Sequence, residues 1–409
     1  MKKPELLSPV QDFTSLKAAI DAGADSIYFG IKELNMRMGA KNFQLKDIKK
    51  VIHICHKNKV KAYFTLNTII YDNEINKIKK ILKKLKGENI GAIICWDFSV
   101  IAEADKLNIP IHLSTQASIS NFESLKTITT KFKNIKRVNL ARELSLEQIM
   151  EIIKQIKNNN KNKKLNKIEI ETFIHGAMCV SVSGRCFLSQ ELFNKSANRG
   201  ECLQPCRRKY LIKDVEEKHE LELGEDYITS PKDLCAIDII DRLFKAGINT
   251  FKIEGRNRSP EYVKVATECY REAIDLMQKS KYDKGLKTKL RQKLKTVYNR
   301  GFSTGFYLGK PLDGWTKVYG SKATKKKVYI GKVKNFYKNL GVAEILIESH
   351  ELKINDQLMF QGPTTGVIQQ KIDSMQKDHK EIKKAKKKSR IALKTKKLVR
   401  ENDKVYIIV

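Results

Sequence analysis

Four of the chain's eight cysteines fall within 28 residues, in a stretch rich in glycine and arginine. Six residues separate Cys179 from Cys186, fifteen separate Cys186 from Cys202, and three separate Cys202 from Cys206. Thiolates bind zinc or iron–sulfur clusters, and structural zinc sites usually use closely spaced cysteine pairs. Only the second pair has such spacing. Four irregularly spaced thiolates therefore favour a 4Fe–4S cluster, with zinc or unligated thiols as the alternatives.

A fifth cysteine leaves the ligand set open. Cys235 lies in the run SPKDLCAI, near the expected start of a helix, where the helix dipole favours a thiolate. It could replace Cys206 or Cys202 as a ligand. The other three cysteines lie in apolar helix-like or strand-like runs and are expected to be buried apolar residues: Cys55, Cys95 and Cys269.

Polar residues that could act on a substrate follow several apolar, strand-like runs. These residues are Asn67, Asp97, Gln116, Arg142, His175, Glu254 and Arg256. Ordinary loops and helix caps do not need this combination of amides, an imidazole, carboxylates and arginines. We therefore interpret these residues as one site, although any single residue among them could be a cap or a loop polar residue.

The runs that must position these residues predict the fold. Strand-like runs lie at 5–9, 25–30, 60–68, 91–97, 109–116, 135–142, 167–176 and 249–256, with amphipathic, helix-like segments between them. Strands alternating with helices predict a parallel sheet, and eight such units predict an α/β protein with a (β/α)8, TIM-like barrel. An open doubly wound sheet would need a glycine-rich fingerprint after the first strand, which is missing. The carboxyl ends of barrel strands meet at one mouth, where we expect the polar residues to gather.

Two further regions depart from the barrel pattern. Residues 187–232 interrupt it between the seventh and eighth units, and we expect this insertion to fold over the mouth, making 176–235 a cysteine-rich cluster-binding region of the barrel domain 1–321. Residues 322–409 contain only short strand-like runs and predict a small all-β barrel. Their net charge is about +13, so they are a candidate grip for nucleic acid; a spacer or dimerisation module is the alternative.

Charge and hydropathy limit the class of protein. The chain has 409 residues and a formal net charge of +34, which either reflects a lysine-rich proteome or indicates a polyanionic partner. No apolar run reaches the roughly 18 residues that a membrane span needs. The basic N-terminus lacks the long apolar stretch of a signal peptide, so we expect a cytoplasmic protein without a membrane partner.

Four segments of the chain together resemble one protein family. The chain is similar to the collagenase-like peptidases, family thirty-two of the peptidases of unknown mechanism, in the segments ETFIHGAMCVSVSGRCFLS, NRGECLQPCR, SPKDLC and FKIEGRNRSPEYV. The likeness covers nearly the whole chain. It implies that residues 322–409 form a β-barrel of translation-factor type. It also implies that Cys179, Cys186 and Cys202 are cluster ligands. The fourth ligand varies in the family, which leaves Cys206 and Cys235 as candidates.

The family resemblance implies two classes of activity. Its name implies proteolysis, whereas better understood relatives are implicated in oxygen-independent hydroxylation of a tRNA wobble uridine, of an rRNA cytidine and of ubiquinone precursors. The tRNA and rRNA branches are associated with prephenate as the source of the hydroxyl group. The sequence lacks the H-E-x-x-H motif of zinc proteases. A cysteine protease could use His175, but cysteines that hold a cluster are not free to attack an amide.

We therefore expect iron–sulfur-dependent hydroxylation of a tRNA wobble uridine to 5-hydroxyuridine. Alternatives are a collagenase-like peptidase, hydroxylation of rRNA cytidine, and an RNA-binding factor without activity. The expected catalytic residues are His175 and Glu254, which can move protons, and Arg256, which with Arg142 can clamp a dicarboxylate such as prephenate. Asn67 and Gln116 are expected to read a base edge or orient the oxygen donor. The expected cluster ligands are Cys179, Cys186, Cys202 and Cys206.

Overall fold

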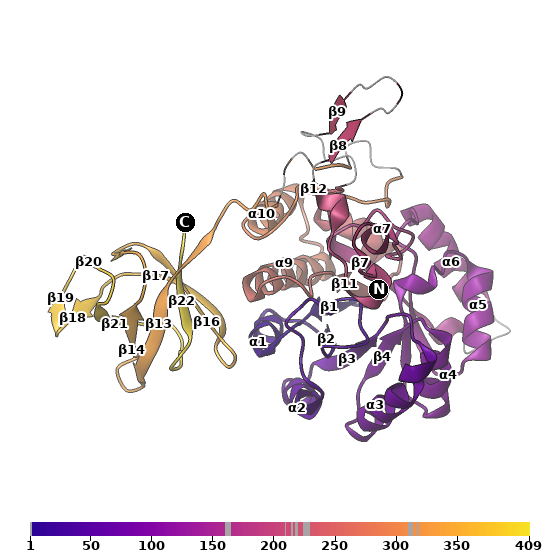
Figure 1. Cartoon of the computed structure of the whole chain (residues 1–409), viewed down its shortest axis with the longest axis horizontal. Coiled ribbons are helices and arrows are strands. Elements are labelled where there is room, and N and C mark those ends of the chain that lie inside the picture. The colour runs from indigo at the N-terminus through magenta and orange to yellow at the C-terminus, as the bar shows by residue number, and fades with distance from the viewer. Residues whose placement is uncertain are drawn as a thin grey trace.

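A computed structural model of the chain describes residues 2–159, 165–208, 210–213, 216, 220–223, 230–309, 314–316, 318 and 320–409. A large α/β barrel and a smaller β-sheet module lie side by side, as Figure 1 shows. Each has its own apolar core. No helix among the described residues is long and apolar enough to cross a membrane.

Eight parallel strands close into a barrel, which confirms the predicted fold class. They are β1 (Glu5–Pro9), β2 (Ser26–Phe29), β3 (Lys61–Leu66), β4 (Ala92–Cys95), β5 (Ile111–Leu113), β6 (Ile135–Asn139), β7 (Glu169–Gly176) and β11 (Thr250–Ile253). Neighbours in this order pair with one another, and β11 pairs with both β7 and β1, which closes the ring. The carboxyl ends of all eight strands therefore share one rim.

The helices that surround the barrel bury one apolar face each. On α6 (Leu146–Asn158), the buried residues recur at helical spacing: Leu146, Ile149, Ile152, Ile153 and Ile156. The other helices of the barrel are α1 (Phe13–Asp21), α2 (Ile48–Lys57), α3 (Ile75–Gly87), α4 (Phe98–Lys106), α5 (Phe122–Lys131), α8 (Ile240–Lys245), α9 (Pro260–Gln278) and α10 (Lys284–Lys295). Side-chain caps fix several helix starts, so the loops at the mouth have defined lengths.

A charged network occupies the lower part of the barrel interior. Arg137 is 1% exposed and forms ion pairs with Glu5 at 2.9 Å and Glu169 at 2.6 Å. Lys252 pairs with Glu171 at 2.8 Å one layer above. Buried charges are tolerated only when they are paired, so these ion pairs stabilise the interior of the barrel.

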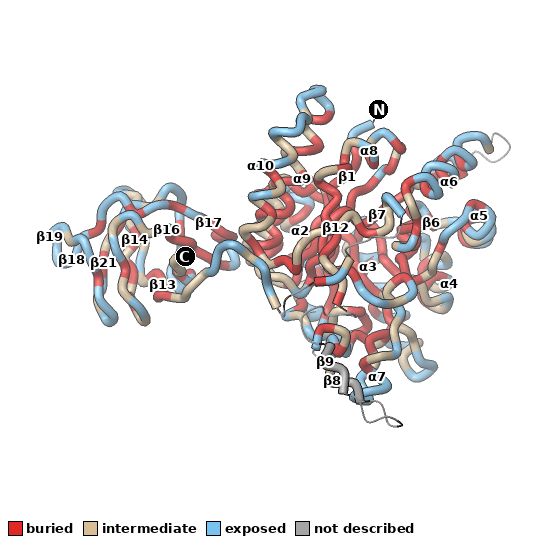
Figure 2. Tube along the Cα trace, turned by 90° about the horizontal axis from the view of Figure 1, so that it is seen from above, coloured by how far each residue is buried: buried red, intermediate tan, exposed pale blue. Residues whose placement is uncertain are grey.

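The insertion between β7 and β11 crosses the mouth, as the sequence predicted. It contains α7 (Leu188–Phe193), a hairpin of β8 (Tyr210–Lys213) and β9 (Glu220–Leu223), and β10 (Asp233–Cys235), which pairs antiparallel with β7. A later strand, β12 (Phe302–Ser303), extends the sheet beside β10. Figure 2 shows α7 at the end of the barrel opposite the N-terminus. Parts of the charged run 214–226 lie outside the described residues.

The C-terminal residues form the predicted all-β module. Eight strands pair in the order β17, β16, β22, β13, β14, β21, β18 and β19, and irregular register in β13 bends the sheet around its core. Their bounds are β13 (Lys327–Tyr337), β14 (Val342–Ile347), β16 (Gln357–Gly362), β17 (Gly366–Lys371), β18 (Gln376–Lys377), β19 (Lys380–Glu381), β21 (Arg390–Lys394) and β22 (Lys404–Ile408). A separate two-stranded ladder joins β15 (Leu352–Lys353) to β20 (Lys384–Ala385).

A polar cluster attaches this module to the barrel wall at α9. The Glu261 carboxylate accepts hydrogen bonds from Lys327 Nζ at 2.9 Å and from Gln361 Nε2 at 2.8 Å. Lys264 Nζ donates to the backbone oxygen of Val367 at 2.7 Å. These contacts hold the basic module in a defined position beside the barrel.

Candidate functional site

Glu254 is the central carboxylate of the barrel mouth. It directly follows β11, and its Oε1 atom lies 3.1 Å from both Nε and Nη2 of Arg37, which comes from the loop between β2 and α2. Burial alone would raise the pKa of this carboxyl, but the charges of Arg37, Arg142 and Arg256 outweigh burial and lower it. Glu254 is therefore an ionised carboxylate that can accept a proton or orient a cationic group.

Arg256, expected to clamp a dicarboxylate, is 2% exposed and bonded to the protein itself. Its Nη1 donates to Thr65 Oγ1 at 2.9 Å, and its Nη2 donates to Asn42 Oδ1. Burial lowers its pKa to about 10. These bonds join β11 to β3 and to the loop after β2, so in this structure Arg256 positions the mouth and is not presented to a substrate.

The amides and Arg142 take up three different environments. Asn67 Oδ1 accepts a hydrogen bond from Met36 N at 3.2 Å, which fixes the loop that carries Arg37. Gln116 is 5% exposed and accepts a hydrogen bond from Ser114. The Arg142 guanidinium stacks 4.0 Å over the Phe173 ring, and its buried Nε atom has no hydrogen-bond partner. Of the three, Arg142 keeps the most unused hydrogen-bonding capacity.

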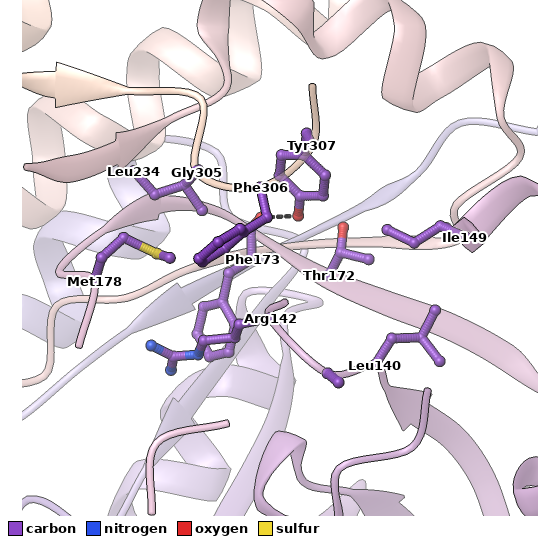
Figure 3. Close-up of a pocket in the computed structure, with 11 residues that line it drawn as sticks. Leu140, Arg142, Ile149, Thr172, Phe173, Met178, Leu234, Gly305, Phe306 and Tyr307 are labelled. Carbon is purple, nitrogen blue, oxygen red and sulfur yellow. Dashed lines mark hydrogen bonds between the residues drawn. The ribbon is translucent and has the colours of Figure 1, made fainter. Parts of the chain in front are cut away.

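Arg142 borders a small cavity on the side of β6 and β7. Figure 3 shows Arg142, Phe173, Met178 and Tyr307 around it. Its volume is about 20 Å³, which is room for a single water molecule. This cavity is too small for a nucleotide or a dicarboxylate.

Two of the sequence-predicted polar residues, Asp97 and His175, make contacts that stabilise the fold. Asp97 caps α4, because its Oδ1 accepts from Ser99 N at 2.9 Å. His175 follows an irregular step in the pairing of β7 with β11 and packs between Tyr262 and Tyr270 of α9, with Nδ1 3.3 Å from the Tyr270 hydroxyl. Burial first, and then the charge of Arg258, lower the His175 pKa to about 3. The expected proton transfer by His175 stays a prediction that these surroundings do not favour.

Four thiols gather in the insertion above Glu254. Burial raises the pKa of Cys202 and of Cys206. The nearby sulfurs of Cys179 and Cys186 add to that rise, and the charges of Arg37 and Arg207 oppose it. Two of the sulfurs already accept backbone hydrogen bonds at 3.4 Å, Cys186 from Leu188 N and Cys202 from Gln204 N. Among the described residues, no group of three or more His, Cys, Asp or Glu side chains is placed to hold a metal ion.

Cys235 lies apart from the four thiols, in the barrel core. It is 3% exposed, and the Tyr270 hydroxyl lies 3.8 Å from its sulfur. Burial raises its pKa to about 11, although the nearby N–H of Ile237 and the Tyr270 hydroxyl oppose that rise. The helix start after Cys235 thus does not produce the thiolate that its sequence position indicated.

Arg37 is the residue of the site that the sequence interpretation missed. It bonds to Glu254 and interacts electrostatically with Cys179 and Cys202, so it connects the carboxylate to the thiols. Its loop, residues 30–44, carries no known motif. An irregular connection of that length at the carboxyl end of a barrel strand is nevertheless a functional signal in itself.

The fold and the thiol-rich mouth define the class of protein as a TIM-like barrel with a cysteine-bearing insertion. The model of peptidase family U32 matches residues 11–317, and the chain belongs to this family. A collagenase of Porphyromonas gingivalis is 44% identical over 98% of this chain and 97% of its own length. An uncharacterized protease of Methanocaldococcus jannaschii is 43% identical over 99% and 98%. The tRNA hydroxylation protein P1 of Bacillus subtilis is 33% identical over 88% and 84%.

The geometry of the mouth predicts a specific sensitivity at Gly176. Its φ is +110°, and a Cβ atom there would lie 2.4 Å from the backbone oxygen of Glu254. We expect Gly176→Ala to lower the free energy of unfolding by about 2 kcal/mol or more, measured by chemical denaturation, because both strain and a backbone clash result. Gly39→Ala is the matched control, since nothing lies within 4 Å of its Cβ position. Equal effects of the two variants would contradict the described closure of β7 on β11.

Proposed function

We propose that the protein is an iron–sulfur-dependent RNA hydroxylase that converts a tRNA wobble uridine to 5-hydroxyuridine, with prephenate as the hydroxyl source. The gathering of four thiols beside Arg37 and Glu254 at the barrel mouth carries this proposal. The relative named as a tRNA hydroxylation protein, which matches most of the chain, supports RNA as the substrate.

The chemistry of the donor set suits a 4Fe–4S cluster, although the described sulfurs are not placed to hold a metal ion in this structure. Cys179, Cys186, Cys202 and Cys206 supply four thiolates, and the backbone N–H bonds to two of the sulfurs are a recognised influence on cluster potential. Cys235 lies apart in the barrel core, whereas Cys206 interacts electrostatically with the other three cysteines, which favours Cys206 as the fourth ligand. When bound, the cluster would supply electron transfer at the mouth.

The arginines of the mouth suit a small dicarboxylate. Arg37 and Arg142 are partly exposed, whereas Arg256 is 2% exposed and bonded to Thr65 and Asn42, so the first two are better placed to bind carboxylates. In hydroxylation, the base carbon gains an oxygen atom and loses two electrons, and the donor loses that atom and accepts both electrons. Ionised Glu254 is suited to accept the proton that leaves the base carbon.

The collagenase and protease names of two relatives keep a peptidase as the second candidate. A cysteine peptidase needs a thiolate that is activated by histidine. The cysteine in register with His175 is Cys235, which is buried with its pKa raised to about 11, and the imidazole has a pKa lowered to about 3. This pair is unsuited to attack a peptide, which counts against a cysteine peptidase that uses it.

The proposal predicts a direct product. Anaerobically reconstituted protein, supplied with prephenate and unmodified tRNA, should add the mass of one oxygen atom to one uridine, as measured by mass spectrometry of the digested nucleosides. Cys186→Ala should form no product, because it removes a thiolate of the cluster, whereas Cys55→Ala, a buried cysteine of α2, should remain active. Cleavage of gelatin with unchanged tRNA would favour the peptidase, and oxidation of an rRNA cytidine alone would assign a different substrate.

The basic C-terminal module is proposed to hold the RNA backbone. Its lysines at 386–388 are exposed. We expect Lys386→Gln, Lys387→Gln and Lys388→Gln in combination to weaken tRNA binding, and each lost phosphate contact should reduce the slope of log affinity against log salt by roughly 0.7 to 0.9. The control is the same Lys→Gln change at three exposed lysines of α3: Lys79, Lys80 and Lys83. A larger effect of the α3 variant would place the RNA on the barrel helices instead.

A further inference from the structure

Three aromatic side chains at the mouth are unusually exposed. Phe187 of the insertion is 73% exposed, Phe98 at the start of α4 is 67% exposed, and Tyr71 in the loop before α3 is 55% exposed. Each ring leaves a large apolar surface in water. Scattered apolar residues on a surface are ordinary, whereas aromatic rings gathered at a functional opening indicate a binding surface. We call Tyr71, Phe98 and Phe187 the aromatic rim.

Contacts of their neighbours bring the three rings to one side of the mouth. Ile70, next to Tyr71, donates its N–H to Asp97, next to Phe98, at 3.2 Å. Ile69 N donates to the backbone oxygen of Asn198 at 3.3 Å, and Asn198 Oδ1 accepts from the N–H of Cys186, next to Phe187, at 3.1 Å. Each ring is thus within two residues of one connected set of hydrogen bonds.

Arginines stack on aromatic rings in the same region. The Arg199 guanidinium lies 4.4 Å from the centre of the Tyr71 ring and is held by Glu74 at 2.6 Å. Arg185 lies 5.8 Å over Trp96 and donates to Ser118 at 3.1 Å. Aromatic rings and guanidinium planes are the two kinds of side-chain surface on which unpaired nucleobases stack.

We propose that the aromatic rim is a stacking platform for unpaired bases of the RNA that flank the reactive nucleotide. The inference rests on the proposed function and makes it more specific, since it selects a single-stranded loop over a duplex. A base inside a duplex cannot reach Glu254 at the barrel mouth, and a base leaving its stack needs new stacking partners. Phe187 directly follows the thiol of Cys186, so the platform borders the proposed reaction centre.

Charge favours nucleic acid over an apolar protein partner on this surface. The chain carries a net charge of +34, which attracts a polyanion and opposes a partner of the same sign. The arginine and aromatic pairs continue into the insertion, where Arg208 lies 4.4 Å over Phe193. This combination of cations and rings is the composition of surfaces that bind single strands.

The test compares single-stranded and duplex RNA binding to full-length protein. Phe98→Ala and Phe187→Ala should each weaken binding of a fluorescent single-stranded oligoribonucleotide by about 5- to 150-fold, because one stacked base is lost, and should leave duplex affinity nearly unchanged. Fluorescence anisotropy at several salt concentrations measures both, and the salt slope should stay constant. The matched control is Met150→Ala, because Met150 is an apolar residue of α6 that is 49% exposed.

Conservative variants separate stacking from general apolar contact. Phe98→Trp and Phe187→Trp should retain single-strand affinity, whereas Phe98→Leu and Phe187→Leu should lose it as the alanine variants do. Restoration by leucine, or unchanged binding by the alanine variants in a protein that hydroxylates tRNA, would overturn the platform and point to a protein partner. A wild-type protein that neither binds nor modifies RNA would overturn the proposed function, and the platform with it.

Discussion

The close approach of β7 to β11, where the barrel ring closes, is the constraint on which the mouth depends. The backbone of Glu254 lies so near Gly176 that no side chain fits between them, and Glu254 N donates to His175 O at 2.8 Å. From this junction β7 leads directly into the cysteine-bearing insertion, while β11 delivers the central carboxylate. The thiols and Glu254 therefore reach one rim although 47 or more residues of sequence separate Glu254 from each of the four thiols.

Electrostatics then determines the state of that carboxylate. Burial works against the charge of Glu254, and three arginines from different parts of the ring outweigh it. Because the folded pKa is below the unfolded one, ionised Glu254 stabilises the fold above about pH 4.3, and that contribution is lost as the pH falls through the folded pKa. Arg256 contributes charge from a fully buried position, bonded to Thr65 and Asn42, and so organises the site without facing a ligand.

Sequence patterns predicted the eight strands, the insertion and the basic β-module, because each has a local signature. Roles that depend on distant partners were harder to predict. The irregular pairing around Ile174 sets His175 against α9, and the bonds of Arg256 involve residues 191 and 214 positions away. Arg37 sits in a loop without a motif, and its importance follows only from the side chains that the barrel brings to it.

The central claim is that four thiols at the mouth hold a 4Fe–4S cluster, and the iron content of purified cysteine variants tests it most directly. Protein prepared anaerobically should contain about four irons per chain. Cys206→Ala should lose most of that iron, whereas Cys235→Ala should keep it, because Cys235 is buried in the barrel core at 3% exposure. Stoichiometric zinc in place of iron, or loss of iron from Cys235→Ala with retention in Cys206→Ala, would contradict the account.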